Sequence, residues 1–229
     1  MLRLALTGGV GSGKSAAAAI FRRLGAHVSQ SDEVGRALMQ PGQAVYEGLV
    51  RHFGPSILAA DGALDRQALA RIGFAEGRIE ELNAIVHPAV IRAQAEWFDE
   101  IEAHEPAAVA IVESALVFET RYTEHGPAND SSPWRTRFDR IVVVTASADV
   151  RRDRYIRRIG GSEPAAMEDF DRRAAVQWSD ERKAELADFV LSNEGSLAQL
   201  EEAVADLYHA LKAESEGRAA QAMLRAACN

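Results

Sequence analysis

The chain has 229 residues, of which 47% are hydrophobic and 26% charged, enough to bury the core of one compact domain with insertions or of two small domains. Its formal net charge is −8. General binders of nucleic acid or membrane surfaces usually carry a basic face, so this charge argues against both kinds of partner. The only cysteine, Cys228, has no internal partner for a disulfide. With no signal-like segment and no apolar stretch of membrane-spanning length, we expect a cytoplasmic protein.

Short apolar runs alternate with longer amphipathic stretches, a pattern typical of an α/β protein with a parallel sheet. Five runs are predicted to be strands, namely Leu2–Thr7, His27–Gln30, Val109–Glu113, Ile141–Thr145 and Phe189–Leu191. The fourth run is apolar on both faces, as expected for a strand that helices cover on each side. A helix is predicted after the first strand at Ser15–Leu24, and Gly25 follows it where a left-handed cap forms easily.

A glycine-rich segment joins the first strand to this helix and reads Gly8-Gly9-Val10-Gly11-Ser12-Gly13-Lys14-Ser15. It matches G-x-x-x-x-G-K-S in the strand–helix context that this phosphate-binding loop requires, which disfavours a glycine-rich turn without nucleotide function. The glycines let backbone N–H groups turn towards phosphates, and the helix N-terminus adds positive potential. Lys14 can reach the β- and γ-phosphates, and the Ser15 hydroxyl can bind Mg²⁺. We assign nucleotide binding to Gly9, Val10, Gly11, Ser12, Gly13, Lys14, Ser15 and Ala16.

A carboxylate and a guanidinium follow the second predicted strand, at Asp32 and Arg36. The ends of parallel strands share one rim, so Asp32 would face the γ-phosphate region, with Arg36 one turn later on the same helix face. Asp32 could orient an acceptor hydroxyl and accept its proton, and Arg36 could bind an anionic group of the acceptor. The same residue types also suit an N-capping aspartate in an i,i+4 ion pair. The residues alone leave both interpretations open.

Residues 34–108 show helical rather than strand periodicity, which predicts a helical insertion beside the sheet. Pro88 is predicted to lie in the first turn of one helix, where proline is tolerated. One face of that helix would then carry Val90, Gln94, Trp97 and Ile101. Farther along, Gly126–Pro133 is rich in turn-forming residues and predicts a surface loop. The last helix has apolar residues at three- and four-residue spacing, and the residues after Ala213 are predicted to be a loose tail.

Two further features suit nucleotide chemistry. Glu113 ends the third predicted strand, where an acidic residue can lie near Mg²⁺. A helical stretch at about 151–182 carries an arginine cluster in which Arg154 and Arg158 share one face at i,i+4 spacing. In a mobile lid these guanidinium groups would neutralise charge on a transferred phosphoryl group. The alternative is an ordinary solvated basic face.

Taken in order, these motifs resemble the dephospho-coenzyme A kinase family over nearly the whole chain. The resemblance begins with Leu6-Thr7 and the glycine-rich loop, then Asp32 with Arg36 and Gln40-Pro41-Gly42. It continues through Leu82-Asn83, His87-Pro88, Leu116-Val117-Phe118-Glu119, Arg154 with Arg158, Gln177, Ala187-Asp188 and Asn193. Many families share the loop alone. The ordered set is far more specific, above all Leu-Asn-x-x-x-His-Pro followed by Ala-Asp-x-x-x-x-Asn.

The resemblance implies an α/β, three-layer P-loop kinase fold with a central parallel sheet, a helical substrate-binding insertion and a helical lid. Residues 1–33, 109–150 and 183–212 would form the nucleotide-binding core, 34–108 the coenzyme-binding insertion, 151–182 the lid and 213–229 the tail. The implied reaction is ATP-dependent phosphorylation of the ribose 3′-hydroxyl of dephospho-coenzyme A, the last step of coenzyme A biosynthesis, with Mg²⁺. The expected protein is a monomer or small homo-oligomer without nucleic-acid or membrane partners.

Site roles carry over on the matching positions. Asp32 is implied to be the catalytic base, assisted by Lys14 and Arg154. Arg154 and Asn193 would join the loop in binding ATP, and Ser15 and Glu113 would bind the metal. The substrate contacts are assigned to Asp32, Arg36, His87 and Leu116. Two departures stand out, because the family usually has an aspartate where this chain has Gln30 and a proline where it has Ala115.

Three alternatives remain beside this interpretation. The nearest is another small-molecule or nucleoside-monophosphate P-loop kinase, against which the helical insertion argues. The second is a GTPase switch, since Asp32-Glu33-Val34-Gly35 matches D-x-x-G, but this segment follows the loop too closely and the sequence has no Asn-Lys-x-Asp to recognise guanine. The third is an inactive relative, against which the retained Lys14, Ser15, Asp32 and Arg154 argue.

Overall fold

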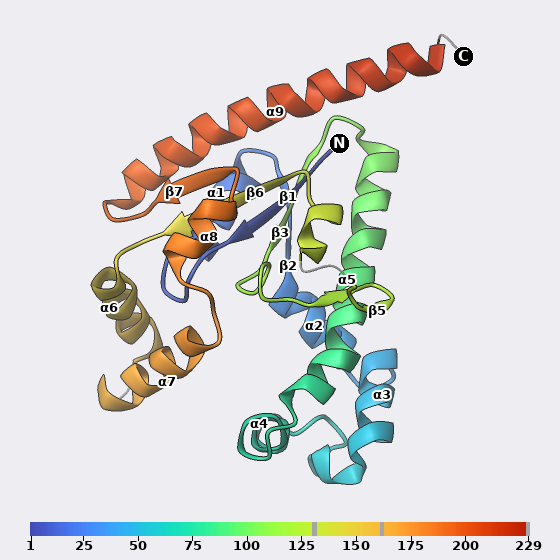
Figure 1. Cartoon of the computed structure of the whole chain (residues 1–229), viewed down its shortest axis with the longest axis vertical. Coiled ribbons are helices and arrows are strands. Elements are labelled where there is room, and N and C mark those ends of the chain that lie inside the picture. The colour runs from blue at the N-terminus through green and yellow to red at the C-terminus, as the bar shows by residue number, and fades with distance from the viewer. Residues whose placement is uncertain (130–131, 161–162, 228–229) are drawn as a thin grey trace. The chain divides into compact units, whose positions relative to one another are not determined.

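A computed structural model describes residues 1–129, 132–160 and 163–227 (Figure 1). The chain divides into two compact units. The first contains Met1–Ser29, Phe98–Glu119 and Trp134–Asn229, and the second contains Gln30–Trp97 and Thr120–Pro133. Cys228 lies outside the described residues, as do Asp130 and Ser131 of the predicted loop and Gly161 and Ser162 of the predicted lid.

The first unit is built on a five-stranded sheet with the strand order β2-β3-β1-β6-β7. These strands are β1 (Leu2–Thr7), β2 (His27–Gln30), β3 (Val109–Glu113), β6 (Arg140–Thr145) and β7 (Phe189–Ser192). Strand β1 pairs in parallel with β3 and β6, and β6 pairs in parallel with β7. All five predicted strands are therefore confirmed. The α/β class is confirmed too, because helices separate the parallel strands along the chain, and the central strands β1, β3 and β6 are largely buried.

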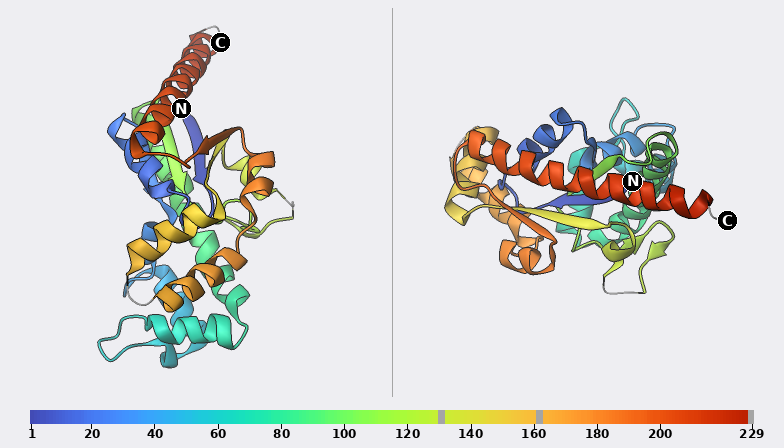
Figure 2. Two further views of the ribbon diagram at one scale, coloured as in Figure 1. Left: turned by 90° about the vertical axis from the view of Figure 1, so that its left-hand side faces the viewer. Right: turned by 90° about the horizontal axis from the view of Figure 1, so that it is seen from above.

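Helices α1 (Lys14–Arg23) and α9 (Leu197–Ala227) pack on each other and on the sheet. Helix α1 buries Ala17, Ala18, Ile20 and Phe21 in the main core. Full burial of each large apolar side chain contributes about 1.5–3 kcal/mol. Gly25 has φ 107° just after α1, which confirms the predicted left-handed cap. Figure 2 shows α9 running alongside the sheet strands of this unit.

The predicted loose tail after Ala213 is wrong, because α9 continues to Ala227. Polar anchors hold this part of the helix in place of an apolar stripe. The fully buried Ser215 hydroxyl donates to the carbonyl of Ala108 at 2.8 Å. Arg218 pairs with Asp139 at 2.6 Å. Polar contacts of this kind do not appear as apolar periodicity in the sequence, so the predicted helix ended before the real one does.

The predicted lid region contains three helices rather than one stretch. They are α6 (Ala148–Ile159), α7 (Glu163–Ala175) and α8 (Asp180–Leu186). Helices α6 and α7 contact each other, and Tyr155 and Phe170 form a small buried cluster with Val10 of the glycine-rich loop. The lid helices therefore share a packing cluster with the loop. Their assignment as a lid stays a prediction.

The second unit is mainly helical, as predicted for most of 34–108. It contains α2 (Ser31–Leu38), α3 (Ala44–Phe53), α4 (Arg66–Ala70), the helical turns η1 (Pro55–Ile57) and η2 (Arg71–Ala75), and most of α5 (Ile79–His104). Val45, Leu49, Ile57 and Ile72 form its buried core. Local signals set the boundaries: Gly54 ends α3 with φ 77°, and the Asp65 carboxylate caps α4 by accepting from two backbone N–H groups.

Two local predictions in this unit are wrong. Helix α5 begins at Ile79, so Pro88 lies inside it rather than in its first turn. A proline removes one backbone hydrogen bond. Helix α5 has 26 residues, so its other backbone hydrogen bonds keep it continuous across Pro88. The Gly126–Pro133 segment is not simply a loop, since β4 (Tyr122–Thr123) pairs antiparallel with β5 (Gly126–Pro127), and Pro133 begins the helical turn η3 (Pro133–Thr136). No helix of the described residues is long and apolar enough to span a membrane.

Candidate active site

The glycine-rich loop leaves the carboxyl end of β1 and leads directly into α1. Its backbone needs glycine at three positions, the first being Gly8, where φ is 148° and an added Cβ would lie 2.2 Å from the carbonyl oxygen of Val144. Gly11 has φ 78°, and an added Cβ would lie 2.3 Å from the carbonyl oxygen of Arg151. Gly13 has φ 97°, and an added Cβ would lie 2.1 Å from Nδ2 of Asn193. The first intrahelical bond of α1 runs from Ala17 N–H to Gly13 C=O at 3.0 Å, so the N–H groups of Ser15 and Ala16 have no intrahelical acceptor and can donate to an anion.

Ser15 and Glu113 lie together, as the metal-site prediction requires. The Ser15 hydroxyl donates to Glu113 Oε1 at 3.0 Å, and Glu113 is only 9% exposed at the end of β3. A hydroxyl and a carboxylate oxygen are ligands that Mg²⁺ accepts, with the rest of its coordination from phosphates and water. No cluster of three or more acidic, histidine or cysteine side chains suited to a metal is found among the described residues. The residues therefore fit a metal shared with a nucleotide.

Lys14 lies within the loop that it is predicted to serve. Its Nζ donates to the Gly9 carbonyl at 3.0 Å. An ammonium group on a flexible stem exchanges one oxygen acceptor for another easily. The contact therefore holds the Lys14 side chain over the loop, where a phosphate oxygen can replace the carbonyl.

Arg154 and Asn193 are connected to the loop by hydrogen bonds. Arg154 Nη1 donates to the Asn193 carbonyl at 2.7 Å, and Asn193 Nδ2 donates to the Ser12 carbonyl at 2.8 Å. Asn193 is 6% exposed. The predicted ATP-binding residues from α6, from the position just after β7 and from the loop are thus brought together. Arg158 is exposed and stacks on the Tyr155 ring, so the arginine cluster divides between site and surface.

Leu116 lies just after β3, where its N–H donates to Ser114 Oγ at 3.3 Å. The neighbouring carbonyl of Ala115 accepts from Lys183 Nζ at 3.1 Å, and the fully buried Lys183 also pairs with Glu119 at 3.0 Å. The Glu119 carboxylate accepts from the Trp178 N–H at 2.7 Å. These bonds tie the segment after β3 to the start of α8. Position 115, where the resemblance leads one to expect proline, is alanine, and the Ala115 carbonyl is the acceptor for Lys183.

Asp32 and Arg36 belong to the second unit, on α2. The N-cap of α2 is Gln30, so Asp32 is not the capping residue. Among the described residues Asp32 and Arg36 form no ion pair with each other, and both are exposed. The structure therefore disagrees with the alternative of a capping aspartate in an i,i+4 pair. Ser31 nearby accepts a hydrogen bond from the buried Gln94 at 2.9 Å.

His87 is also in the second unit, inside α5. Its ring meets the Tyr122 ring edge-on, with centroids 5.4 Å apart. Burial, followed by the nearby Glu80 carboxylate, raises the pKa of the Tyr122 hydroxyl above its usual value. His87 therefore packs against β4 of the β4–β5 hairpin, and its role as a substrate contact stays a prediction.

Three residues at the loop escaped assignment from the sequence. Asp180 Oδ1 accepts from the Gly9 N–H at 3.0 Å, and Gln177 Oε1 accepts from the Val10 N–H at 2.9 Å. Arg151 packs against Gly9 and Gly11. Asp180 looks like an ordinary first-turn acid, because Ser179 caps α8 just before it. Sequence spacing gave no sign that this side chain turns back to the loop.

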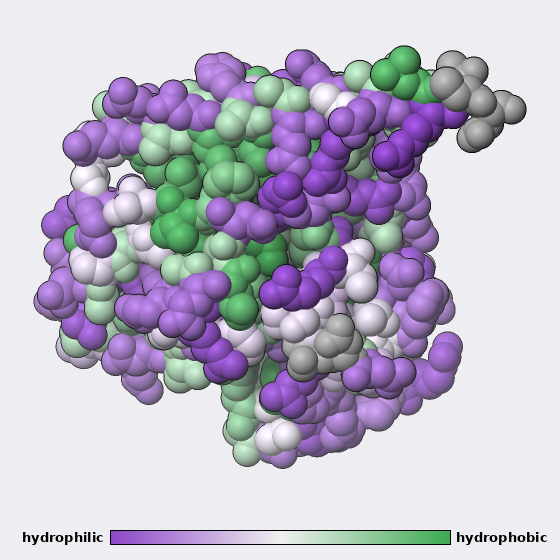
Figure 3. Space-filling view, turned by 45° about the horizontal axis from the view of Figure 1, so that its top comes forward, coloured by the Kyte–Doolittle hydropathy of each residue, from purple (hydrophilic) through white to green (hydrophobic). Residues whose placement is uncertain are grey.

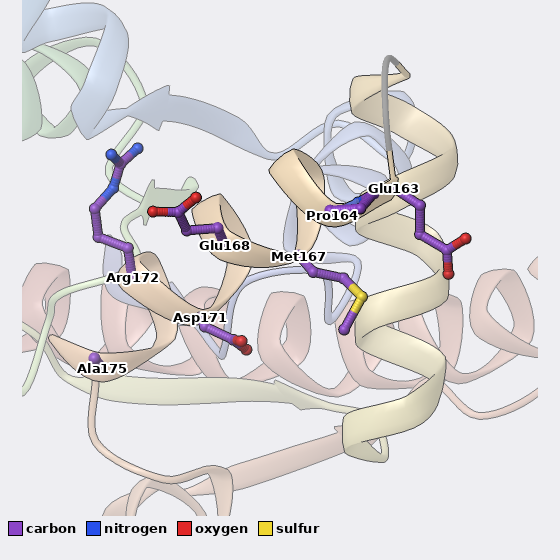
Figure 4. A pocket seen from close by; sticks show the side chains of 7 residues that line it. All are labelled: Glu163, Pro164, Met167, Glu168, Asp171, Arg172 and Ala175. Carbon is purple, nitrogen blue, oxygen red and sulfur yellow. The ribbon is translucent and has the colours of Figure 1, made fainter.

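A hollow of about 850 Å³ lies along α7 and contains none of the predicted site residues (Figure 4). Its lining residues are Glu163, Pro164, Met167, Glu168, Asp171, Arg172 and Ala175. They recur at three- and four-residue spacing, so they form one face of a single helix. The opposite face carries the buried Ala166 and Phe170. This hollow is open helix surface and does not compete with the loop as the candidate site.

Comparison with known proteins agrees with this geometry. A family model described as dephospho-CoA kinase matches residues 2–199. The dephospho-CoA kinase of Symbiobacterium thermophilum is 38% identical over 197 residues, covering 85% of this chain and 74% of the relative. That of Syntrophotalea carbinolica is 35% identical over 208 residues, covering 90% of each. The crystal structure of TT1252 from Thermus thermophilus is 30% identical with a TM-score of 0.70, covering 92% of this chain and 97% of that one. The chain therefore belongs to the dephospho-CoA kinase family.

Proposed function

We propose that this protein transfers the γ-phosphoryl group of ATP to the ribose 3′-hydroxyl of dephospho-coenzyme A, giving coenzyme A and ADP. The observation that carries the proposal is the assembled phosphate-binding loop, in which Arg154 donates to Asn193 and Asn193 donates to Ser12, in a member of the dephospho-CoA kinase family. The loop supplies a strand–turn–helix anion site. The family membership supplies the acceptor.

Phosphoryl transfer requires alignment and charge neutralisation more than covalent chemistry by the protein. The first-turn N–H groups of α1 would bind the phosphate chain, and Lys14 would exchange the Gly9 carbonyl for phosphate oxygens. Arg154, held by the Asn193 carbonyl, would balance charge on the transferred group. Asn193 fixes Ser12 and so preserves the shape of the loop between turnovers.

Ser15 and Glu113 would hold Mg²⁺ on the nucleotide side of the site, directly or through water. When bound, Mg²⁺ supplies charge neutralisation on the β- and γ-phosphate oxygens. The chain's own contribution is to hold the exposed Ser15 hydroxyl 3.0 Å from the Glu113 carboxylate, which is only 9% exposed.

Asp32 would orient the ribose 3′-hydroxyl and accept its proton as the new P–O bond forms. Its carboxylate is exposed on α2 and has no ion-pair partner among the described residues, so it is available to a substrate hydroxyl. Arg36, one turn later, would bind an anionic group of the acceptor. His87 and Leu116 are proposed as further substrate contacts, with the 34–108 region holding the coenzyme and 151–182 closing as a lid.

The reaction consumes ATP, so we propose a cytoplasmic location, and we expect a monomer or small homo-oligomer. The defining test measures ADP release from ATP·Mg²⁺ with and without dephospho-coenzyme A, and checks by mass for a product that gains one phosphate. Strong stimulation with coenzyme A formed would establish substrate and reaction. If ATP binds but dephospho-coenzyme A does not stimulate ADP release, the proposed acceptor is wrong. Nucleotide and sugar acceptors would then be tested.

A further inference from the structure

Arg151 and Asp180 both lie against Gly9, in the first turn of the glycine-rich loop. Asp180 reaches the loop from the first turn of α8, where Oδ1 accepts from the Gly9 N–H at 3.0 Å. Arg151 reaches it from α6, where an added Cβ on Gly9 would lie 2.1 Å from Nη1 and one on Gly11 2.3 Å from the Arg151 carbonyl. The loop is therefore in direct contact with both side chains.

The Arg151 guanidinium and the Asp180 carboxylate form an ion pair, but their facing atoms are too far apart for a hydrogen bond. Arg151 Nε and Asp180 Oδ2 are 3.7 Å apart, and the two side chains are only 18% and 9% exposed. Both atoms are buried, and neither has a hydrogen-bond partner among the described residues. A carboxylate so close to an anion-binding loop would oppose phosphate binding unless a cation matched it. Arg151 is the cation placed to do so.

A second contact ties the same turn to the lid helices. The Val10 N–H donates to Gln177 at 2.9 Å, while the Val10 side chain packs with Tyr155 and Phe170. The first turn of the loop is thus held by two side-chain acceptors and one apolar cluster. Asp180 contributes the only one of these contacts that brings a formal charge.

We propose that Arg151 and Asp180 are positioning residues for ATP. Asp180 fixes the Gly9 amide and so sets the shape of the loop, and Arg151 cancels the charge that Asp180 brings to the anion site. The pair acts through the loop and not on the acceptor hydroxyl. This inference rests on the proposed function only for the identity of the nucleotide, so its test uses ATP·Mg²⁺ binding and needs no dephospho-coenzyme A.

A double-mutant cycle tests the pair, with dissociation constants for ATP·Mg²⁺ measured by calorimetry on the whole chain. Arg151→Gln leaves the Asp180 carboxylate buried without its cation and is expected to weaken binding about 10-fold or more. Asp180→Asn keeps an oxygen acceptor for Gly9 and is expected to bind as well as wild type or better. The double variant is expected to return to within about 3-fold of wild type, because no buried charge is left unmatched.

Amide exchange followed residue by residue gives an independent measure of the Asp180 bond. Asp180→Ala is expected to speed exchange at Gly9 about 10-fold or more while Val10, held by Gln177, stays protected. Asp180→Asn should leave both amides protected. A variant that is merely unstable would speed both, so the two amides separate loss of the bond from loss of the fold.

The matched control is Asp149→Asn on α6. Asp149 is also 3.7 Å from its arginine, Arg152, but is 94% exposed, and its removal is expected to change nothing measurable. Additive effects in the cycle, or an unchanged dissociation constant for Arg151→Gln, would overturn the proposal. So would equal effects of Asp149→Asn and Arg151→Gln. Each of these results concerns ATP alone, so none of them depends on the acceptor.

Discussion

Asn193 shows how a single buried amide can serve the nucleotide site without being one of its charged groups. Its carbonyl accepts from Arg154, and its side chain donates to Ser12. An added Cβ on Gly13 would collide with this same side chain. One residue therefore couples the arginine, the loop backbone and the requirement for glycine at position 13.

At the residue scale, Asp32→Asn is expected to lower kcat roughly 10²–10⁴-fold, because the amide cannot accept the hydroxyl proton. The dissociation constant of ATP should stay nearly unchanged, since Asp32 is assigned to the acceptor. Steady-state kinetics and ATP calorimetry measure the two effects. Glu33→Gln is the matched control, as Glu33 is the next exposed carboxylate on α2. A kcat near wild type in Asp32→Asn would rule out the assigned base.

At the scale of elements, α9 carries two kinds of surface. Its middle part is anchored by Ser215 and Arg218 and buries Ala219. Its last turns expose Met223 and Leu224, 64% and 68% accessible, and apolar side chains are visible there near the end of the helix (Figure 3). The part of α9 up to residue 219 should therefore stabilise the folded state, whereas the residues after 219 should contribute little to its stability.

Two truncations separate these parts. Removing residues 220–229 is expected to change the melting temperature by less than about 2 °C, whereas removing 214–229 should lower it by roughly 4–8 °C. The larger loss combines a buried hydrogen bond, a half-exposed ion-pair network and a buried alanine, about 2 kcal/mol together. Thermal unfolding followed by circular dichroism measures both. Equal melting temperatures would show that the polar anchors contribute nothing.

A second element-scale prediction concerns α5 and pH. Arg78 contacts Glu81 through two hydrogen bonds of 2.8 and 2.7 Å, and His52 lies 2.6 Å away. Arg78 first, and then His52, lowers the pKa of the Glu81 carboxyl from 4.5 to about 2. A carboxyl with a lowered pKa stabilises the folded state above its unfolded pKa and loses that contribution as pH falls through its folded value.

The stabilisation from Glu81 should therefore be complete above about pH 4.5 and disappear towards pH 2. Melting temperatures of wild type and Glu81→Gln are expected to differ near neutral pH and to converge in acid. Glu47→Gln, an exposed carboxylate on α3, should track wild type throughout. A constant difference at every pH would mean that Glu81 acts through packing instead of charge.

For the whole molecule, ATP·Mg²⁺ at about 100 times its dissociation constant should stabilise the folded state by about 2.7 kcal/mol, which raises the melting temperature by roughly 5–10 °C. Lys14→Ala is expected to remove most of this shift, because the β- and γ-phosphates lose their ammonium partner. A chelator should reduce the shift if Ser15 and Glu113 hold the metal. Differential scanning calorimetry with ATP, with and without the chelator, measures both, and a shift that survives Lys14→Ala would contradict the loop assignment.

The sequence predicted the centre of the sheet well because β1, β3 and β6 are buried along most of their length and so appear as apolar runs. The loop was equally readable, since glycine, lysine and serine at fixed spacing are required by backbone geometry and phosphate charge. The start of helix α5 was predicted wrongly at Pro88, because a helix of this length remains stable when the proline removes one backbone hydrogen bond. The end of α9 was missed because Ser215 and Arg218 anchor it through polar contacts.

The site was predictable only where motif spacing encodes it. Ser15 lies in the first turn of α1, just after the loop that leaves β1, and Glu113 ends the neighbouring strand β3, so the shared sheet edge brings them together. Arg151 and Asp180 lie 29 positions apart on separate helices, and no periodicity connects them. Contacts of that kind depend on how helices return to the loop, which the sequence pattern does not specify.

Burial of Lys183 also has a chemical consequence. The chain has only three lysines, Lys14, Lys183 and Lys212. Lys183 is fully buried against Glu119, whereas Lys14 sits in the loop and Lys212 lies at a surface ion pair. A reagent that acylates amines should therefore label the native protein at very few sites. Nucleotide should protect one of them, the peptide that carries Lys14, so occupancy of the loop can be followed by mass without any assay of turnover.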